Sequence, residues 1–131
     1  MDKISAVITS LSYTEWGEGT APREINIDLD QLDDVVIARK DIGTSYHLSV
    51  VLDDHDSGVN VVTRGKDLEP STPIHRLLQE LLGLNEMVWS HHNLITDENG
   101  QRLAKRDSSQ SIKYFREQGL GRGEILRMIK S

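Results

Sequence analysis

The sequence contains no cysteine, only three prolines and few aromatic residues. Without cysteine there is no disulfide framework, no thiolate nucleophile and no cysteine-ligated zinc or iron–sulfur centre, which is compatible with a reducing compartment. No apolar stretch approaches the roughly 18 residues that a membrane-spanning helix needs. The opening residues Met1, Asp2 and Lys3 do not have the layout of a signal peptide. We therefore expect a soluble, cytoplasmic protein with no membrane partner.

The 131 residues fit one compact domain or part of one. Twenty-one acidic and 15 basic residues give a net charge of −6, which argues against a general nucleic-acid coat protein. The charge is unevenly spread, because residues 1–56 hold 12 acidic and 4 basic groups whereas residues 101–131 hold 3 acidic and 8 basic groups. The C-terminal segment is thus either a set of solvated helix faces or a surface for anions.

Short extended segments are expected in the N-terminal half. Residues 4–11 and the alternating positions from Ile25 to Leu29 predict two strands, which a glycine-containing loop at residues 17–19 separates. The β-branched run at residues 35–39 predicts a further strand, followed by a turn around Gly43. The apolar run at residues 46–52 is too short to decide between strand and helix, and we expect it to be extended before a helical turn.

The middle of the chain predicts a βα unit of a parallel sheet. Residues 59–63 predict a buried strand that delivers Arg64, Lys66 and Asp67 to its carboxyl end, where ligands bind in open α/β sheets. A helix is then expected from Ser71, as a hydroxyl cap, to residue 82, with Gly83 as its stop. Its apolar positions, which we expect to pack on the sheet, are Ile74, Leu77, Leu78, Leu81 and Leu82.

The rest of the chain predicts a hairpin or loop and two short helices. Residues 87–89 and 94–95 frame the hairpin, with Asn99 and Gly100 as its turn. Residues 109–118 and 124–130 predict the helices, which residues 119–121 divide. The second helix is expected to bury Ile125, Met128 and Ile129.

Two clusters suggest metal ligands, and each has a plainer explanation. The acidic cluster at residues 53–56 contains three aspartates and His55, but a solvated turn accounts for it, since adjacent residues rarely converge on one ion. His91 and His92 would point to opposite faces of an extended segment, so one cation cannot readily use both. We predict no metal site. The sequence motifs of serine hydrolases, phosphate-binding loops and zinc proteases are also missing.

A basic loop carries the strongest chemical signal. Residues 94–107 place Arg102, Lys105 and Arg106 close together after a glycine turn. Clustered cations on a loop suit a polyphosphate, where a lysine can neutralise the charge that develops on a pyrophosphate leaving group.

This loop resembles a known signature. The five residues Arg102, Leu103, Ala104, Lys105 and Arg106 resemble the Lys-Met-Ser-Lys-Ser motif of class I aminoacyl-tRNA synthetases, in the Lys-Leu-Ser-Lys-Arg form of the glutamyl enzymes. Blocks at residues 34–41, 45–54, 62–68 and 71–79 are similar to consecutive blocks of the glutamyl-tRNA synthetase catalytic domain. The resemblance covers about residues 33–131. It also extends to the short paralogues, the glutamyl-Q tRNA(Asp) synthetases, an expectation that the few residues after Arg106 support.

The resemblance implies an α/β fold and a reaction. Residues 1–107 would form the second half of a Rossmann-like class I synthetase catalytic domain, a short parallel sheet with helices. Residues 1–32 would be an insertion-like segment, and residues 108–131 a small helical extension. The implied reaction is the activation of glutamate by ATP, with magnesium, and its transfer to tRNA, with tRNA(Asp) favoured.

The resemblance also implies roles for four residues. Tyr46 and Arg64 would contact glutamate, Arg64 as the planar fork for a carboxylate. Lys105 would be the catalytic residue that holds the ATP phosphates, and Asp67 would support the loop or a ribose contact. Taken alone, Tyr46 is better explained as a half-buried strand tyrosine, and Asp67 as a cap on the approach to a helix.

Two departures limit this implication. The signature loop has Arg102 and Ala104 where lysine and serine are usual, and no His-Ile-Gly-His-type motif occurs in the sequence. We therefore expect an incomplete chain that is inactive alone. The alternatives are a non-catalytic module that binds ATP or tRNA through Arg64, Lys105 and Arg106, or a fragment that a missing N-terminal half or a second copy completes.

Overall fold

The computed structural model describes residues 8–17, 19–94, 96 and 111–130. The chain divides into two compact units, Met1–Asn93 and Leu94–Ser131. The predicted domain boundary at residue 107 lies outside the described residues and stays a prediction. No helix in the described ranges is both long and apolar enough to cross a bilayer.

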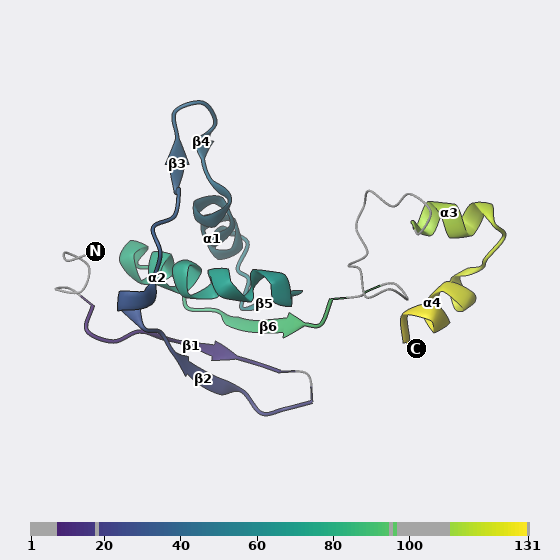
Figure 1. Ribbon diagram of the computed structural model, residues 1–131, viewed down its shortest axis with the longest axis horizontal. Coiled ribbons are helices and arrows are strands. Elements are labelled where there is room, and N and C mark those ends of the chain that lie inside the picture. Colours follow the sequence, from purple (N-terminus) through teal and green to yellow (C-terminus); the bar gives the residue numbers. More distant parts are fainter. Residues whose placement is uncertain (1–7, 18, 95, 97–110, 131) are drawn as a thin grey trace. The chain divides into compact units, whose positions relative to one another are not determined.

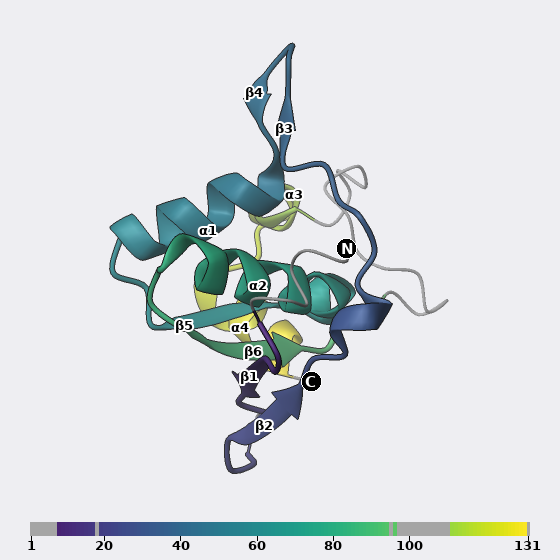
Figure 2. The ribbon, with the colours of Figure 1, turned by 90° about the vertical axis from the view of Figure 1, so that its left-hand side faces the viewer.

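The first unit is a four-stranded sheet with two helices on one face (Figures 1 and 2). The strand order is β2-β1-β6-β5, in which β1 pairs antiparallel with β2, and β6 lies parallel to both β1 and β5. This confirms the predicted α/β class with a short parallel sheet. The bounds of the sheet strands are Ser12–Glu15 for β1, Arg23–Asn26 for β2, Val61–Gly65 for β5 and Val88–His92 for β6.

The prediction of a strand over residues 4–11 was wrong for its described residues, 8–11, because β1 begins after them, and the second strand begins and ends earlier than predicted. β1 begins at Ser12, although the backbone N–H of Ile27 donates to the Leu11 carbonyl oxygen at 2.8 Å and extends the pairing by one rung. Residues 4–7 of the predicted strand lie outside the described residues. The second strand ends at Asn26, because Asp28 caps a short 3₁₀ helix, η1 (Leu29–Gln31), through a hydrogen bond from the Asp30 backbone N–H.

Residues 35–39 do not form the predicted strand over their whole length. Only β3 (Ala38–Arg39) is extended, and it pairs with β4 (Gly43–Thr44) in a small hairpin that projects away from α1 (Figure 2). Gly43 adopts a φ of +81°, which favours glycine and permits the tight return. Val36, which precedes β3, is 60% exposed.

Residues 46–52 are helical, so the prediction of an extended segment was wrong. They form α1 (Tyr46–Asp56), and the acidic cluster at residues 53–56 is its last turn. Val51 is buried while the helix packs against α2 (Thr72–Leu82). This tertiary contact outweighs the weak local preference of its β-branched residues.

The predicted helix over residues 71–82 is confirmed as α2, with Gly83 ending it in a left-handed conformation. A 3₁₀ helix, η2 (Lys66–Ser71), leads into it, so the Ser71 side chain makes no capping hydrogen bond. The expected packing of its apolar face on the sheet was wrong for most positions. Leu77 is buried, but Leu81 and Leu82 are each 47% exposed. The buried polar residues of α2 are Thr72, His75, Arg76 and Gln79.

Of the predicted hairpin or loop, residues 88 and 89 of the first arm lie in β6, which pairs in parallel with β1 and β5 as the inner strand. Ile95, Asn99 and Gly100 lie outside the described residues. Met87 and Trp89 are each 1% exposed, and the Trp89 ring meets Tyr13 edge to face with centroids 5.7 Å apart. The apolar core of the first unit gathers around these residues, with Ile8, Leu11, Ile27 and Leu77.

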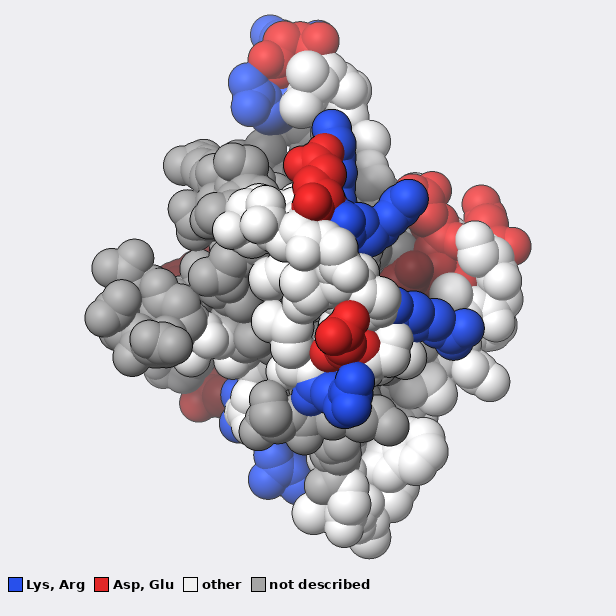
Figure 3. All heavy atoms as spheres, turned by 90° about the vertical axis from the view of Figure 1, so that its right-hand side faces the viewer, with Lys and Arg blue, Asp and Glu red and all other residues white. Residues whose placement is uncertain are grey.

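The described residues 111–130 of the second unit form the two helices α3 (Ile112–Glu117) and α4 (Arg122–Lys130), as predicted. The Ser111 hydroxyl caps α3 by accepting a hydrogen bond from the Tyr114 backbone N–H at 3.0 Å. Ile125 is half-buried, but Met128 is 50% exposed, so its predicted burial was wrong. The Ile129 side chain lies outside the described residues. On the face that Figure 3 shows, basic and acidic side chains are interspersed.

Candidate functional site

The inward side of the sheet changes from apolar to polar along the parallel strands. Tyr13, Trp89 and Val62 lie in the earlier part of their strands and belong to the core or pack against it. Glu15, His91 and Arg64 follow near the carboxyl ends of β1, β6 and β5. Ligands bind at this end of the strands in open α/β sheets. The polar row therefore marks the candidate site.

Arg64 is the centre of this row. It is 8% exposed, and its three guanidinium nitrogens each contact a different side chain. The Nε–H donates to His91 Nε2 at 3.1 Å, Nη1 lies 2.9 Å from His75 Nδ1, and Nη2 donates to the Thr72 hydroxyl at 2.6 Å. Thr72 and His75 come from the first turn of α2, so the helix start and the strand end meet at Arg64.

His91 connects Arg64 to a buried carboxylate. Its Nδ1 lies 3.0 Å from Glu15 Oε2, and its backbone N–H donates to Glu15 Oε1 at 3.3 Å. Glu15 is 4% exposed. A buried carboxylate is costly unless it is hydrogen-bonded, and His91 supplies two donors to it.

His75 connects Arg64 to the start of α1. Its Nε2 lies 3.0 Å from His47 Nδ1, and the Tyr46 ring makes edge contacts with His47 and His75 at centroid distances of 5.6 and 5.7 Å. Burial, followed by the charges of Arg64 and His47, lowers the pKa of His75 to about 3. His75 is therefore neutral at physiological pH.

The pKa of the Arg64 guanidinium is lowered by burial. The charge of Tyr46 and a hydrogen bond to its side chain oppose this shift most strongly, followed by the charges of Asp54 and Glu15. The pKa of the Asp54 carboxyl is also shifted: burial raises it, and the charge of Arg64 acts in the opposite direction. Tyr46, Asp54 and Arg64 thus form one electrostatic group.

The structure brings together two of the residues predicted from the sequence. Tyr46 is half-exposed at the start of α1 rather than on a strand, and it interacts with Arg64. Asp67 lies exposed in η2, between Arg64 and α2. The other predicted residues lie outside the described ones. These are Arg102, Leu103, Ala104, Lys105 and Arg106.

Sequence reasoning missed Thr72, His75 and His91 as hydrogen-bonding partners of Arg64. It also missed Glu15 as the partner of His91 and His47 as the partner of His75. The sequence carries no local signal for these contacts, because they join β1, β5 and β6 to the starts of α1 and α2. His91 and His92 separate as predicted, because His91 is buried and His92 is exposed. In the described residues no group of three or more metal-ligating side chains is placed to hold an ion.

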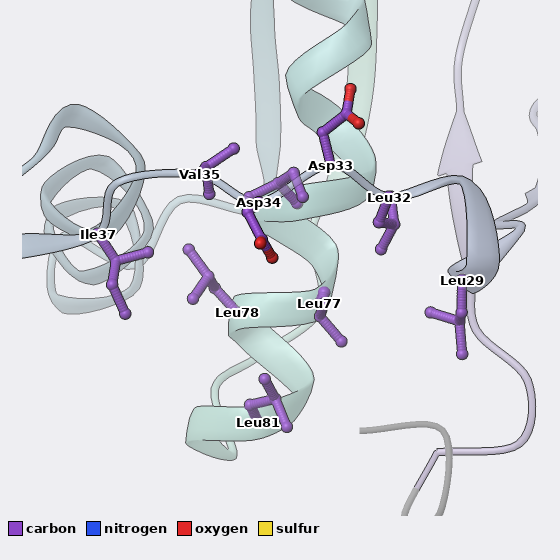
Figure 4. Close-up of a pocket in the computed structure, with 10 residues that line it drawn as sticks. Leu29, Leu32, Asp33, Asp34, Val35, Ile37, Leu77, Leu78 and Leu81 are labelled. Carbon is purple, nitrogen blue, oxygen red and sulfur yellow. The ribbon is translucent and has the colours of Figure 1, made fainter. Parts of the chain in front are cut away.

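A hollow of about 270 Å³ lies away from this polar row. It separates the exposed apolar side of α2 from the segment that precedes β3, and Leu77, Leu78 and Leu81 face that segment (Figure 4). Asp33 and Asp34 are its charged members. It shares no residue with the polar row around Arg64.

The chain is similar to two kinds of curated relative. It is 54% identical over 96 residues to the glutamyl-Q tRNA(Asp) synthetase of Rhodobacter capsulatus, covering 73% of this chain and 34% of that protein. It is 38% identical over 96 residues to the glutamate–tRNA ligase of Vesicomyosocius okutanii, covering 73% and 21%. The chain therefore spans about a third or less of the curated relatives it matches.

A solved structure and a family model agree with these relatives. The glutamate-tRNA synthetase of Elizabethkingia anophelis superposes with a TM-score of 0.55 at 32% identity, covering 68% of this chain and 18% of that one. The family model described as tRNA synthetases class I (E and Q), catalytic domain, matches residues 12–131. The chain belongs to this family of class I aminoacyl-tRNA synthetases.

Proposed function

We propose that the chain supplies the glutamate-binding side of an enzyme that activates glutamate with ATP and transfers it to tRNA. One observation carries this proposal: Arg64 lies at the carboxyl end of a parallel strand with its three nitrogens held by three different side chains. A guanidinium has five N–H groups, so these three contacts leave two, and the Tyr46 side chain is a hydrogen-bond partner of Arg64 as well. A planar guanidinium that is held in this way beside a tyrosine suits the recognition of a carboxylate.

In this proposal Tyr46 and Arg64 contact glutamate, and Lys105 holds the phosphates of ATP, which binds with magnesium. Asp67 supports the signature loop or a ribose contact. A lysine near the phosphates would neutralise the charge that develops on pyrophosphate when the glutamate carboxylate attacks the α-phosphorus. The match to a glutamyl-Q tRNA(Asp) synthetase supports tRNA(Asp) as the acceptor.

Glutamate binding by the chain is the first test, measured by isothermal titration calorimetry. Arg64→Lys keeps the charge but removes the planar fork, and Tyr46→Phe removes only the hydroxyl of an exposed ring. We expect both variants to weaken glutamate binding, while Arg39→Ala, at an exposed arginine of the β3–β4 hairpin, leaves it unchanged. Equal affinity of the wild type and Arg64→Lys would remove Arg64 from the site.

Glutamate-dependent ATP–pyrophosphate exchange tests the reaction. The sequence contains no His-Ile-Gly-His-type motif, and we propose that exchange requires a polypeptide that carries it. The chain alone is expected to show no exchange. If it does catalyse exchange and both Arg64→Ala and Lys105→Ala abolish it, the chain is a minimal activating enzyme and the requirement for the motif is wrong.

A second candidate is a module that binds ATP or tRNA without catalysis. It is favoured by the excess of basic residues, 8 against 3 acidic, in residues 101–131. tRNA binding that weakens steeply with salt and is lost in a Lys105→Ala, Arg106→Ala double variant, without any exchange, would support it. A fragment that its own copy completes would instead show a concentration-dependent mass.

A further inference from the structure

Arg64 determines which atoms donate and which accept in two series of side-chain hydrogen bonds, one through His91 and one through His75. An arginine side chain only donates hydrogen bonds and stays protonated in proteins. Each ring nitrogen that meets the guanidinium must therefore be an unprotonated acceptor. This condition applies to His91 Nε2 at 3.1 Å and to His75 Nδ1 at 2.9 Å.

On one side the chain runs through His91 to Glu15. Since Nε2 of His91 accepts from Arg64, the ring is neutral and carries its proton on Nδ1. That proton points to the Glu15 carboxylate, 3.0 Å away. The side chain of His91 is fully buried and that of Glu15 is 6% exposed, so neither ring nor carboxylate can exchange this contact for water without opening the fold.

On the other side the chain runs through His75 to His47. Since Nδ1 of His75 accepts from Arg64, its proton is on Nε2, which donates to His47 Nδ1 at 3.0 Å. His75 is 2% exposed. The low pKa of His75, which its burial and the Arg64 charge produce, agrees with a neutral ring.

We infer that His75 and His91 are positioning residues that hold the Arg64 guanidinium in one orientation, so that its remaining N–H groups serve Tyr46 and a carboxylate ligand. The identity of that ligand as glutamate rests on the proposed function, but the orientation does not. Thr72 contributes the third anchor by accepting from Nη2. When the N–H donors of Arg64 are held in place before binding, the entropic cost of binding the ligand is lower.

Nuclear magnetic resonance tests the orientation without any ligand. Long-range ¹H–¹⁵N spectra of the full chain should show His91 protonated at Nδ1 and His75 protonated at Nε2. The Arg64 Nε–H should exchange with water at least about tenfold more slowly than the Nε–H of the exposed Arg39, because opening a buried site precedes exchange. The opposite tautomers, or equal exchange of the two arginines, would overturn the inference.

Conservative variants separate positioning from general packing. His91→Gln places an amide oxygen near the former Nε2, and His75→Asn places one near the former Nδ1, so each restores the acceptor for Arg64. His91→Ala and His75→Ala do not. We expect slow Arg64 Nε–H exchange in His91→Gln and faster exchange in His91→Ala. His92→Ala, on the neighbouring exposed histidine of β6, is the matched control and should leave the exchange rate unchanged.

Glutamate titration of the same variants connects the inference to function. Leaving a buried donor of Arg64 without its acceptor should weaken glutamate binding at least about fivefold in the alanine variants, with recovery in His91→Gln and His75→Asn. If the wild-type chain has the predicted tautomers and slow exchange but binds no glutamate, the proposed function fails for this chain and the positioning role stands. Should the alanine variants fold and bind glutamate as the wild type does, the positioning role is wrong.

Discussion

Arg64 on β5 and His91 on β6 are register partners in the parallel sheet, and their side chains join through the 3.1 Å hydrogen bond from Nε to Nε2. Backbone pairing and side-chain pairing therefore coincide at one rung. A shift of either strand by one residue would turn its side chain to the opposite face of the sheet. The residue pair that aligns β5 with β6 thus also positions the Arg64 guanidinium, the candidate ligand-binding group.

The first prediction concerns the tryptophan at the centre of the core. Trp89→Ala should lower the free energy of unfolding by about 3–5 kcal/mol, because it leaves a large cavity beside Tyr13. Urea denaturation followed by circular dichroism measures this loss. Trp16→Ala is the matched control, since Trp16 is 48% exposed and its loss should cost less than about 1 kcal/mol. Equal costs would contradict the assigned core.

The second prediction is a dependence of stability on pH. The pKa of His75 falls from 6.5 in the unfolded chain to about 3 in the fold. Between these values the unfolded chain binds a proton that the folded chain does not. The free energy of unfolding is therefore highest above pH 6.5 with respect to His75, and it decreases as the pH falls towards 3. The free energy of unfolding should drop by up to about 1.4 kcal/mol per pH unit from this group.

His75→Asn isolates that contribution, because asparagine does not titrate. Denaturation at a series of pH values should show a shallower acid slope in His75→Asn than in the wild type. The slope of His92→Ala should stay closer to the wild-type slope, since His92 is exposed. If His75→Asn and the wild type have the same slope between pH 6.5 and 3, His75 is not held neutral by the fold.

The third prediction concerns the end of α2. Gly83 has a φ of +65°, and a Cβ added there would meet no atom within 4 Å. Gly83→Ala should therefore destabilise the first unit by about 1–2 kcal/mol through backbone strain alone. Gly123→Ala is the converse case, since Gly123 lies within α4 with open space around it. It should raise the helicity of α4, because alanine favours a helix more than glycine does.

The fourth prediction tests which side of α2 is buried. Leu77→Ala should lower the free energy of unfolding by about 2–5 kcal/mol, because Leu77 belongs to the core cluster. Leu82→Ala should change it by less than about 1 kcal/mol, because Leu82 is 47% exposed. The same denaturation experiment measures both. A larger loss from Leu82→Ala would show that the apolar side of this helix packs inward after all.

Local patterns in the sequence predict elements whose signals are strong on their own. The start and stop of α2 follow from Pro73 and Gly83, and α3 and α4 follow from the glycines between them. β6 was not predictable in this way. Its role as the inner parallel strand depends on pairing with Ser12–Glu15 and Val61–Gly65, which are distant along the chain.

Two features were harder to predict because tertiary contacts decide them: whether a short apolar segment is a helix or a strand, and which side of a helix packs inward. α1 is helical where it packs on α2. The periodicity of α2 identified an apolar side correctly, but Arg64 and Ser12 require polar partners, so His75 and Arg76 turn inward. Arg76 donates from Nε to the Ser12 carbonyl oxygen at 3.1 Å. Periodicity alone distinguishes the apolar side of a helix from its polar side. It does not predict which of the two sides packs on the sheet.

For the candidate site, the sequence predicts the central residue better than its surroundings. Arg64 is identifiable from its place near the end of a predicted strand, and Tyr46 from its resemblance to a family block. The predicted burial of that strand was wrong, because in β5 only Arg64 is buried and Val61 is 37% exposed. Glu15, His75 and His91 have no local signal for a shared site. Their proximity exists only after three strands and one helix have assembled.

Glu15 and His91 are 76 positions apart in the sequence, and their contact lies at the middle of the sheet. Such distant contacts carry a large loop-closure cost and form slowly in folding. No short peptide from this chain can reproduce the surroundings of Arg64. A ligand of Arg64 that binds only the folded unit will also stabilise that unit by mass action, so protection of Met1–Asn93 against unfolding would report occupancy of the site.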